Sequence, residues 1–153
     1  MPGLENEYVN ELGNLICGDG FLGVFPSDIQ PQIKVGQCKF SVIFNTDEHT
    51  EKGSHFVAIF RNKSKFFYFD SFGKNCKYKN IKMFIKKNLN NQKYIYNNKC
   101  IQAEDSLFCG FFCISFINSL NKNSSLDKFI SNFSLNNLTK NDNVVTKMIT
   151  KVV

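Results

Sequence analysis

The chain has 153 residues, of which 42% are apolar, and its 19 Lys and Arg against 13 Asp and Glu give a formal net charge of +6. A chain of this length buries roughly two thirds of its unfolded surface, which is enough for a hydrophobic core without disulfides or metal. No stretch approaches the ~18 apolar residues of a membrane span, and the polar first residues lack the plan of a secretory signal. We therefore expect a single domain over residues 1–153, not secreted, with its six cysteines as free thiols.

The first half of the chain predicts one helix and then strands. Residues 4–17 have apolar side chains at helical spacing and acidic residues early, and the glycines at 18 and 20 end this helix. Residues 21–34 contain a glycine and two prolines, and we expect an irregular connection there. Residues 39–45, 55–61 and 65–70 are rich in β-branched and aromatic residues and predict a central, mostly antiparallel sheet.

The second half predicts mainly helices. Residues 77–89 have one apolar face and predict a surface helix packed on the sheet, and short strand-like pieces at 94–96 and 99–102 flank a turn. Residues 109–120 are apolar all round, which predicts a helix buried in the middle of the domain. Two weaker helices are expected at 125–133 and 143–152, so the fold class is α+β, with a sheet packed against helices.

A candidate nucleophile begins the buried helix. Cys109 stands at the N-terminus of this helix, where the dipole and the free N–H groups favour a thiolate and offer a donor to an oxyanion. Gln102 comes seven residues earlier, and its amide could donate a second hydrogen bond. The alternative for Cys109 is a core residue, which is the more common role of a cysteine on an apolar helix.

The candidate base comes from the two histidines of the chain. His49 lies in a polar stretch expected to be a loop, whereas His55 opens an apolar strand and is the better base. Asp70 ends the next strand, and it lies beside His55 if the two strands form a hairpin, where a carboxylate orients the imidazole. The alternatives are a structural histidine and an aspartate that caps a turn. With two histidines and scattered cysteines, no metal site is expected.

Positive charge is concentrated in residues 61–100, which carry eleven basic side chains and one acid. A polyanion such as DNA could dock on this segment, and the alternative is a solvated lysine-rich surface. The candidate DNA contacts are Lys63, Lys65, Lys77, Lys79, Lys82, Lys86 and Lys87.

The order His55, Asp70, Gln102, Cys109 resembles that of the adenovirus maturation protease (adenain) family, which includes related proteases of Polinton/Maverick elements and virophages. Phe56 stands where the family has Trp, and Asp70 stands where the adenovirus enzymes have Glu. The resemblance covers about residues 4–120 and rests on four blocks: Cys17-Gly18-Asp19-Gly20-Phe21-Leu22-Gly23, Asn45-Thr46 with Gly53-Ser54-His55-Phe56-Val57-Ala58, Phe67-Tyr68-Phe69-Asp70-Ser71-Phe72-Gly73, and Ile101-Gln102 with Cys109-Gly110-Phe111-Phe112-Cys113.

The resemblance implies a papain-like/adenain-like cysteine protease fold. It implies His55 as general base, Asp70 as its partner, Cys109 as nucleophile, and Gln102 with the Cys109 N–H as the oxyanion hole. The implied function is a thiol endopeptidase (a hydrolase) that cleaves capsid and other structural precursors at Gly-containing sites during virion maturation. Its implied location is the virion and the infected host cell, in a cytoplasmic factory or the nucleus.

No cofactor is required for this chemistry, and DNA and a viral peptide are the implied activators. In the adenovirus enzyme the peptide is disulfide-linked, and Cys100 lies near the position of the linking cysteine. Two other functions stay open. A deconjugating protease of the SUMO/ubiquitin-like class shares the order of the four residues, although Asp usually precedes its cysteine where this chain has Phe108. A catalytically silent, nucleic-acid-binding virion protein is the second.

Overall fold

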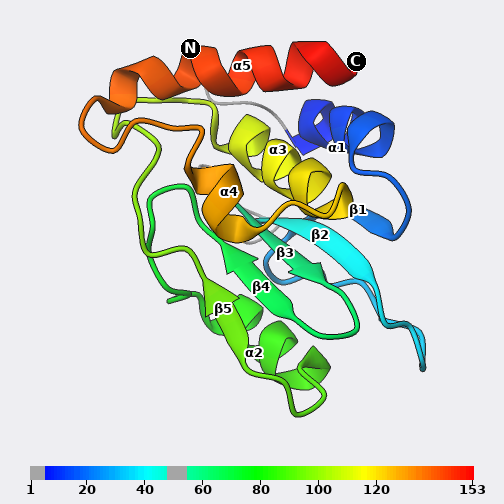
Figure 1. The fold of residues 1–153 in the computed structure, drawn as a ribbon. Coiled ribbons are helices and arrows are strands. Elements are labelled where there is room, and N and C mark those ends of the chain that lie inside the picture. The colour runs from blue at the N-terminus through cyan, green and yellow to red at the C-terminus, as the bar shows by residue number, and fades with distance from the viewer. Residues whose placement is uncertain (1–5, 48–54) are drawn as a thin grey trace.

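The computed structural model describes residues 6–47 and 55–153, and its centre is a five-stranded sheet in the order β1-β2-β3-β4-β5 (Figure 1). The central strands β2, β3 and β4 pair antiparallel, as expected, whereas the two edge strands pair parallel with their neighbours. The strands are β1 (Phe21–Pro26), β2 (Phe40–Asn45), β3 (Phe56–Arg61), β4 (Phe66–Phe69) and β5 (Tyr94–Tyr96).

Two predictions about strands are wrong. β1 forms where an irregular connection was expected, because an edge strand tolerates Pro26 and an irregular register around Gly23. Residues 99–102 form no strand. The N–H groups of Ile101 and Gln102 donate to the carbonyl of Ser71 at 2.9 and 3.2 Å, so they make loop hydrogen bonds where a strand would continue the ladder.

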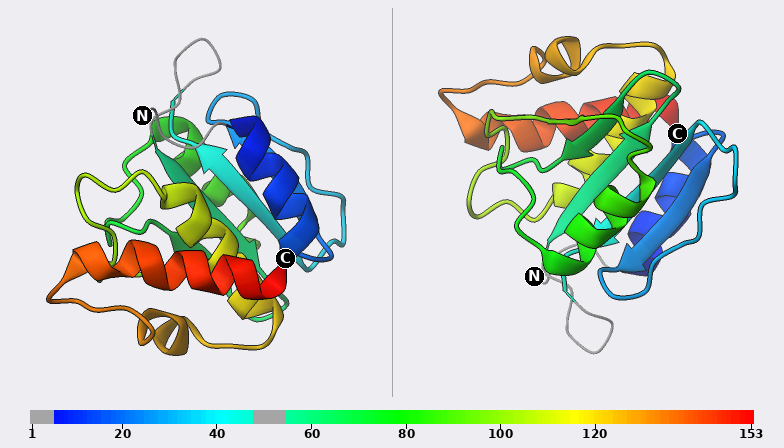
Figure 2. Two further views of the ribbon diagram at one scale, coloured as in Figure 1. Left: turned by 90° about the horizontal axis from the view of Figure 1, so that it is seen from above. Right: turned by 90° about the horizontal axis from the view of Figure 1, so that it is seen from below.

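Helices cover both faces of the sheet, as the three views show (Figures 1 and 2). One face carries a single helix, α2, and the other carries α1, α3, α4 and α5. The fold is therefore α+β with a sheet between two layers of helices. The helices are α1 (Asn6–Ile16), α2 (Lys79–Asn88), α3 (Cys109–Asn121), α4 (Leu126–Ile130) and α5 (Asn141–Val152), with a short 3₁₀ turn, η1 (Leu138–Lys140).

The core on the larger helical layer is centred on α3. Every residue of β2, β3 and β4 is buried, which is typical of a sheet covered on both faces. Phe116 of α3 stacks on Phe69 of β4 with ring centroids 4.6 Å apart, and Phe129 of α4 meets both rings edge-on. The prediction that residues 109–120 form a buried helix is confirmed.

The remaining helices differ from expectation mainly in their ends. α4 ends at Ile130, earlier than the expected 133, and α5 begins at Asn141, two residues before the expected start. α1 lies within the predicted range 4–17. None of the helices in the described part of the chain has the length and hydropathy that a membrane-spanning segment requires.

Candidate active site

Cys109 is the first residue of α3, and only 7% of its surface is exposed. The preceding residue, Phe108, occupies the N-cap position and makes no side-chain capping hydrogen bond. The first turn of α3 therefore presents backbone N–H groups and the positive end of the helix dipole beside the Cys109 thiol. This combination stabilises an anion at the start of a helix that is otherwise buried.

His55 and Asp70 come together because β3 and β4 form an antiparallel pair. His55 directly precedes β3, Asp70 directly follows β4, and Ala58 lies opposite Phe69 in the register of the pair. The Nε2 atom of His55 lies 3.0 Å from Oδ1 of Asp70. Their side chains are 13% and 4% exposed, so this contact is largely shielded from water.

The His55 imidazole also contacts the nucleophile. Its Nε2 faces Asp70, and the Cys109 side chain is a second hydrogen-bond partner of the ring. Burial lowers the pKa of His55, but the hydrogen bonds and the negative charges of Asp70 and Cys109 outweigh burial and raise the pKa from 6.5 to about 9. His55 is therefore protonated at neutral pH, and its positive charge lies beside the Cys109 side chain.

Two residues that the sequence analysis did not single out hold Asp70 and His55 in place. The Phe72 N–H donates to Oδ1 of Asp70 at 2.8 Å, and the Phe72 ring lies 5.0 Å from the imidazole of His55. Asn97 is 3% exposed, accepts from the Asp70 N–H at 3.1 Å and donates to the Asp70 carbonyl at 2.7 Å. The sequence around Asn97 indicates only a turn, because nothing local points to a partner 27 residues away.

Gln102 is 1% exposed, and both ends of its amide are hydrogen bonded. The Ser71 hydroxyl donates to Oε1, and Nε2 donates to the carbonyl and the hydroxyl of Ser106 at 3.0 and 3.2 Å. The Phe108 N–H donates to the same Ser106 hydroxyl at 3.2 Å. The Gln102 amide therefore lies between the turn that follows β4 and the start of α3.

The segment that leads to Gln102 passes close to the backbone of this turn at Gly73. Gly73 has a φ of +74°, and a Cβ at this position would lie 2.5 Å from the carbonyl carbon of Lys99 and 2.6 Å from the nitrogen of Cys100. Only glycine combines this φ with that much space for a neighbouring chain. Cys100 is partly exposed, and its Sγ donates to the Gln102 carbonyl at 3.2 Å.

The seven lysines predicted to contact DNA are all exposed. α2 packs on the face of the sheet opposite α3 (Figure 2), so most of this basic surface lies away from the helix that carries Cys109. Four of the lysines lie on α2, one lies two residues before it and two lie at the β3–β4 turn: Lys79, Lys82, Lys86 and Lys87; Lys77; and Lys63 and Lys65.

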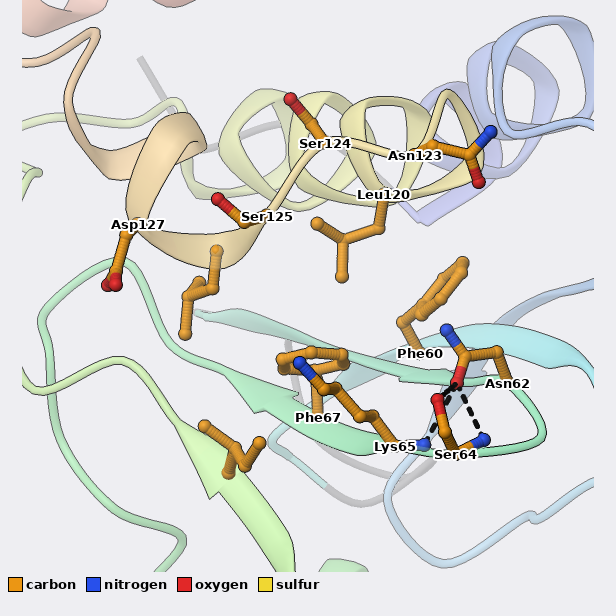
Figure 3. A pocket seen from close by; sticks show the side chains of 12 residues that line it. Phe60, Asn62, Ser64, Lys65, Phe67, Leu120, Asn123, Ser124, Ser125 and Asp127 are labelled. Carbon is orange, nitrogen blue, oxygen red and sulfur yellow. Dashed lines mark hydrogen bonds between the residues drawn. The ribbon is translucent and has the colours of Figure 1, made fainter.

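A separate pocket lies at the far end of α3 (Figure 3). It is lined by apolar residues such as Phe60, Phe67 and Leu120 and by polar residues such as Asp127, and it contains none of the candidate catalytic residues. Leu120 lies roughly 16 Å along the helix from Cys109. In residues 6–47 and 55–153, no three His, Cys, Asp or Glu side chains gather closely enough to hold a metal ion. His49 lies outside the described residues.

The fold of this chain is also found in solved protease structures. The chain has an α+β fold of the papain-like, adenain-like cysteine protease type. Two crystal structures of the ASFV pS273R protease share it. One is 19% identical to this chain with a TM-score of 0.62, and the match covers 87% of this chain and 60% of the ASFV chain. The other is 23% identical with a TM-score of 0.55, and the match covers 75% of this chain and 44% of the ASFV chain.

A bacterial structure matches over nearly the whole length. The central domain of the uncharacterized Lpg1148 protein from Legionella pneumophila has a TM-score of 0.56 at 11% identity and covers 99% of this chain and 96% of its own. At this identity the match concerns the fold alone.

In sequence, the chain is similar to a protein of Acanthamoeba polyphaga mimivirus named "Putative thiol protease R355". The two are 34% identical over 149 residues, and the match covers 83% of this chain and 49% of the mimivirus protein. This chain thus spans about half the length of the curated relative it matches. No family model matches the sequence. The sequence relative is thus named a putative thiol protease, and two of the structures that share the fold are named proteases.

Proposed function

We propose that this chain is a cysteine endopeptidase of a virus or virus-like element of the adenain type. It cleaves capsid and other structural precursors at Gly-containing sites during virion maturation, in the virion and the infected cell. The observation that carries the proposal is the contact of one protonated histidine, His55, with both Asp70 and the Cys109 side chain at a helix N-terminus. Similarity to viral thiol proteases supports the chemistry, and the four sequence blocks support the substrate class.

The reaction starts from an imidazolium–thiolate pair. The Sγ of Cys109 attacks the carbonyl carbon of the scissile peptide bond, and His55 gives its proton to the leaving amine as the C–N bond breaks. Asp70 holds the imidazole through Nε2 and stabilises its positive charge throughout. A water molecule then attacks the thioester. His55 takes a proton from this water, the C–S bond breaks, and Cys109 returns to the thiolate.

The oxyanion formed in both steps needs donors, and we assign two. One is the Cys109 N–H at the start of α3, and the other is Nε2 of Gln102. An amide nitrogen has two hydrogens, and one of them is held by the Ser106 carbonyl at 3.0 Å. The Ser106 hydroxyl lies 3.2 Å from the same nitrogen. We assign both Ser106 contacts to this one hydrogen and the second hydrogen to the oxyanion.

Cleavage assays with the purified chain test the proposal. Gly-Gly and Gly-x-Gly peptides are compared with folded SUMO and ubiquitin C-terminal reporters. We expect cleavage of the peptides that is lost in Cys109→Ala and kept in Cys38→Ala, which removes an exposed thiol outside the site. Cleavage of the folded reporters alone would assign the chain to the deconjugating proteases. No cleavage, together with a thiol probe that fails to label Cys109, would indicate a silent virion protein.

We also propose that DNA activates the chain by binding the lysine-rich surface on α2. The support is the exposure of all seven candidate lysines. Binding to a DNA duplex is expected to weaken as salt rises, because the lysines displace counterions from the phosphates. Lys82→Glu with Lys86→Glu should weaken binding more than the matched pair Lys147→Glu with Lys151→Glu on α5. Binding independent of salt would contradict the proposal.

An activating peptide is the second proposed partner. Cys100 is the candidate for its disulfide, because its thiol is free and partly exposed and lies beside the Gln102 segment. A cysteine-containing peptide that activates the chain should lose its effect in Cys100→Ser. Equal activation of the variant would exclude this linkage.

A further inference from the structure

We propose that the first turn of α5 positions the Gln102 amide, through Ser106 and Asp142, and is thereby part of the oxyanion site. Gln102 is the catalytic residue in this arrangement, and Ser106 and Asp142 are positioning residues that act through it. The consequence for catalysis rests on the proposed function. The orientation of the Gln102 amide does not, and it can be measured separately.

The Ser106 hydroxyl is the centre of the arrangement. A hydroxyl has one hydrogen and two lone pairs, and Ser106 donates its hydrogen to Oδ1 of Asp142 at 2.6 Å. Its lone pairs are thereby directed at Nε2 of Gln102 and at the Phe108 N–H, both 3.2 Å away. A hydrogen bond to a carboxylate is shorter and stronger than one between neutral groups, so Asp142 fixes the direction of the hydroxyl. Without Asp142, the hydroxyl is free to turn its hydrogen toward Gln102.

The neighbouring residue of α5 holds the other side of Gln102. Asn141 is completely buried, and its Nδ2 donates to the Ile101 carbonyl at 2.8 Å. Asn141 is itself fixed by Ser134, with which it exchanges hydrogen bonds of 2.7 and 2.9 Å. Two consecutive residues of α5 therefore hold Ile101 before Gln102 and Ser106 after it. Figure 1 shows the segment that leads into α3 running beside the N-terminal end of α5.

This arrangement bears on both proposed donors to the oxyanion. The hydroxyl that accepts from Gln102 also accepts from Phe108, the residue directly before Cys109. The Ser106 hydroxyl therefore links the Gln102 amide directly to the start of α3. An acid in the first turn of a helix is favourable for the helix dipole alone, and this would explain Asp142 without Ser106. The test must separate these two roles.

The test compares Asp142→Ala and Ser106→Ala with Asp127→Ala. Asp127 is the matched control because it is the acid in the first turn of α4, exposed and outside these hydrogen bonds. The first readout is the exchange of the Gln102 side-chain amide hydrogens with water, followed by NMR. Exchange should become roughly tenfold faster in Asp142→Ala and Ser106→Ala, and it should be unchanged in the control.

The second readout is kinetic. In Asp142→Ala and Ser106→Ala, kcat for peptide cleavage should fall roughly 10- to 100-fold with little change in KM, because the donor acts on the transition state. Alkylation of Cys109 by iodoacetamide forms no oxyanion, so its rate should stay within about twofold of the original chain. Asp142→Asn retains an acceptor oxygen without the charge, and its kcat should lie between those of the original chain and Asp142→Ala.

Thermal unfolding of each variant separates lost positioning from lost folding, and Ser106→Ala provides the test if Asp142→Ala fails to fold. Unchanged exchange of the Gln102 amide in Ser106→Ala and Asp142→Ala would overturn the proposal, as would a loss of alkylation equal to the loss of kcat. If the original chain cleaves no substrate, the proposed function fails, and the exchange measurement still decides whether α5 positions Gln102.

Discussion

Replacing Asp70 by Asn keeps the shape of the side chain beside His55 and removes its negative charge. Burial lowers the pKa of His55, and Asp70 is the first of the groups that outweigh burial and raise the pKa to about 9. An opposite charge at this distance typically moves a pKa by roughly 1–3 pH units. We therefore expect the pKa of His55 to fall by about that amount in Asp70→Asn, while Cys109 continues to favour the protonated ring.

The same reasoning predicts how stability depends on pH. A pKa raised from 6.5 to about 9 means that the folded chain prefers the protonated ring by roughly 3 kcal/mol. This stabilisation is complete below pH 6.5 and is lost as the pH rises through about 9. Across that range, the His55 contribution to the free energy of unfolding should fall by up to about 1.4 kcal/mol per pH unit. In Asp70→Asn the fall should be smaller and should end at a lower pH.

An NMR titration of the histidine ring hydrogens measures these pKa values directly. The chain has only two histidines, and His49→Gln identifies the signal of His55. Asp127→Asn serves as the control, since it removes the same charge from an exposed site on α4. A midpoint for His55 near 6.5 in the original chain would refute the reasoning, and so would equal midpoints in the original chain and Asp70→Asn.

Three further substitutions test other parts of the structure. Gln102→Ala should lower kcat roughly 100- to 1,000-fold while iodoacetamide labelling of the nucleophile is retained, and an unchanged kcat would exclude this amide from the oxyanion hole. Gly73→Ala should destabilise the chain by more than about 1 kcal/mol in urea unfolding, because its Cβ would lie 2.5 Å from the backbone of Lys99 at a φ of +74°. Phe116→Ala should cost about 3–5 kcal/mol in the same assay, since its ring is fully buried against Phe69, and a loss under about 1 kcal/mol would contradict this packing.

The local pattern of apolar and polar residues along the chain predicted a large part of this fold. The strands β2 to β4 and the helix α3 are visible in the sequence because their apolar residues form continuous runs of the appropriate length. The pairing of His55 with Asp70 follows from the same patterns, because consecutive antiparallel strands bring the start of one to the end of the next. β1 was missed because Gly23 and Pro26 are typical of loops, and only its place at the edge of the sheet makes them acceptable in a strand.

The sequence by itself therefore determined the α+β class, the helix that begins at Cys109 and the candidate base with its carboxylate, because each depends on local periodicity or on adjacent strands. The tertiary structure alone decided which groups hold the amide of Gln102. Asp142 is 36 residues from the hydroxyl that it orients, and a polar side chain in an Asn-rich region looks the same whether its partner is water or a buried group. Which of these applies depends on how α5 packs beside the segment before α3, and no local pattern encodes that contact.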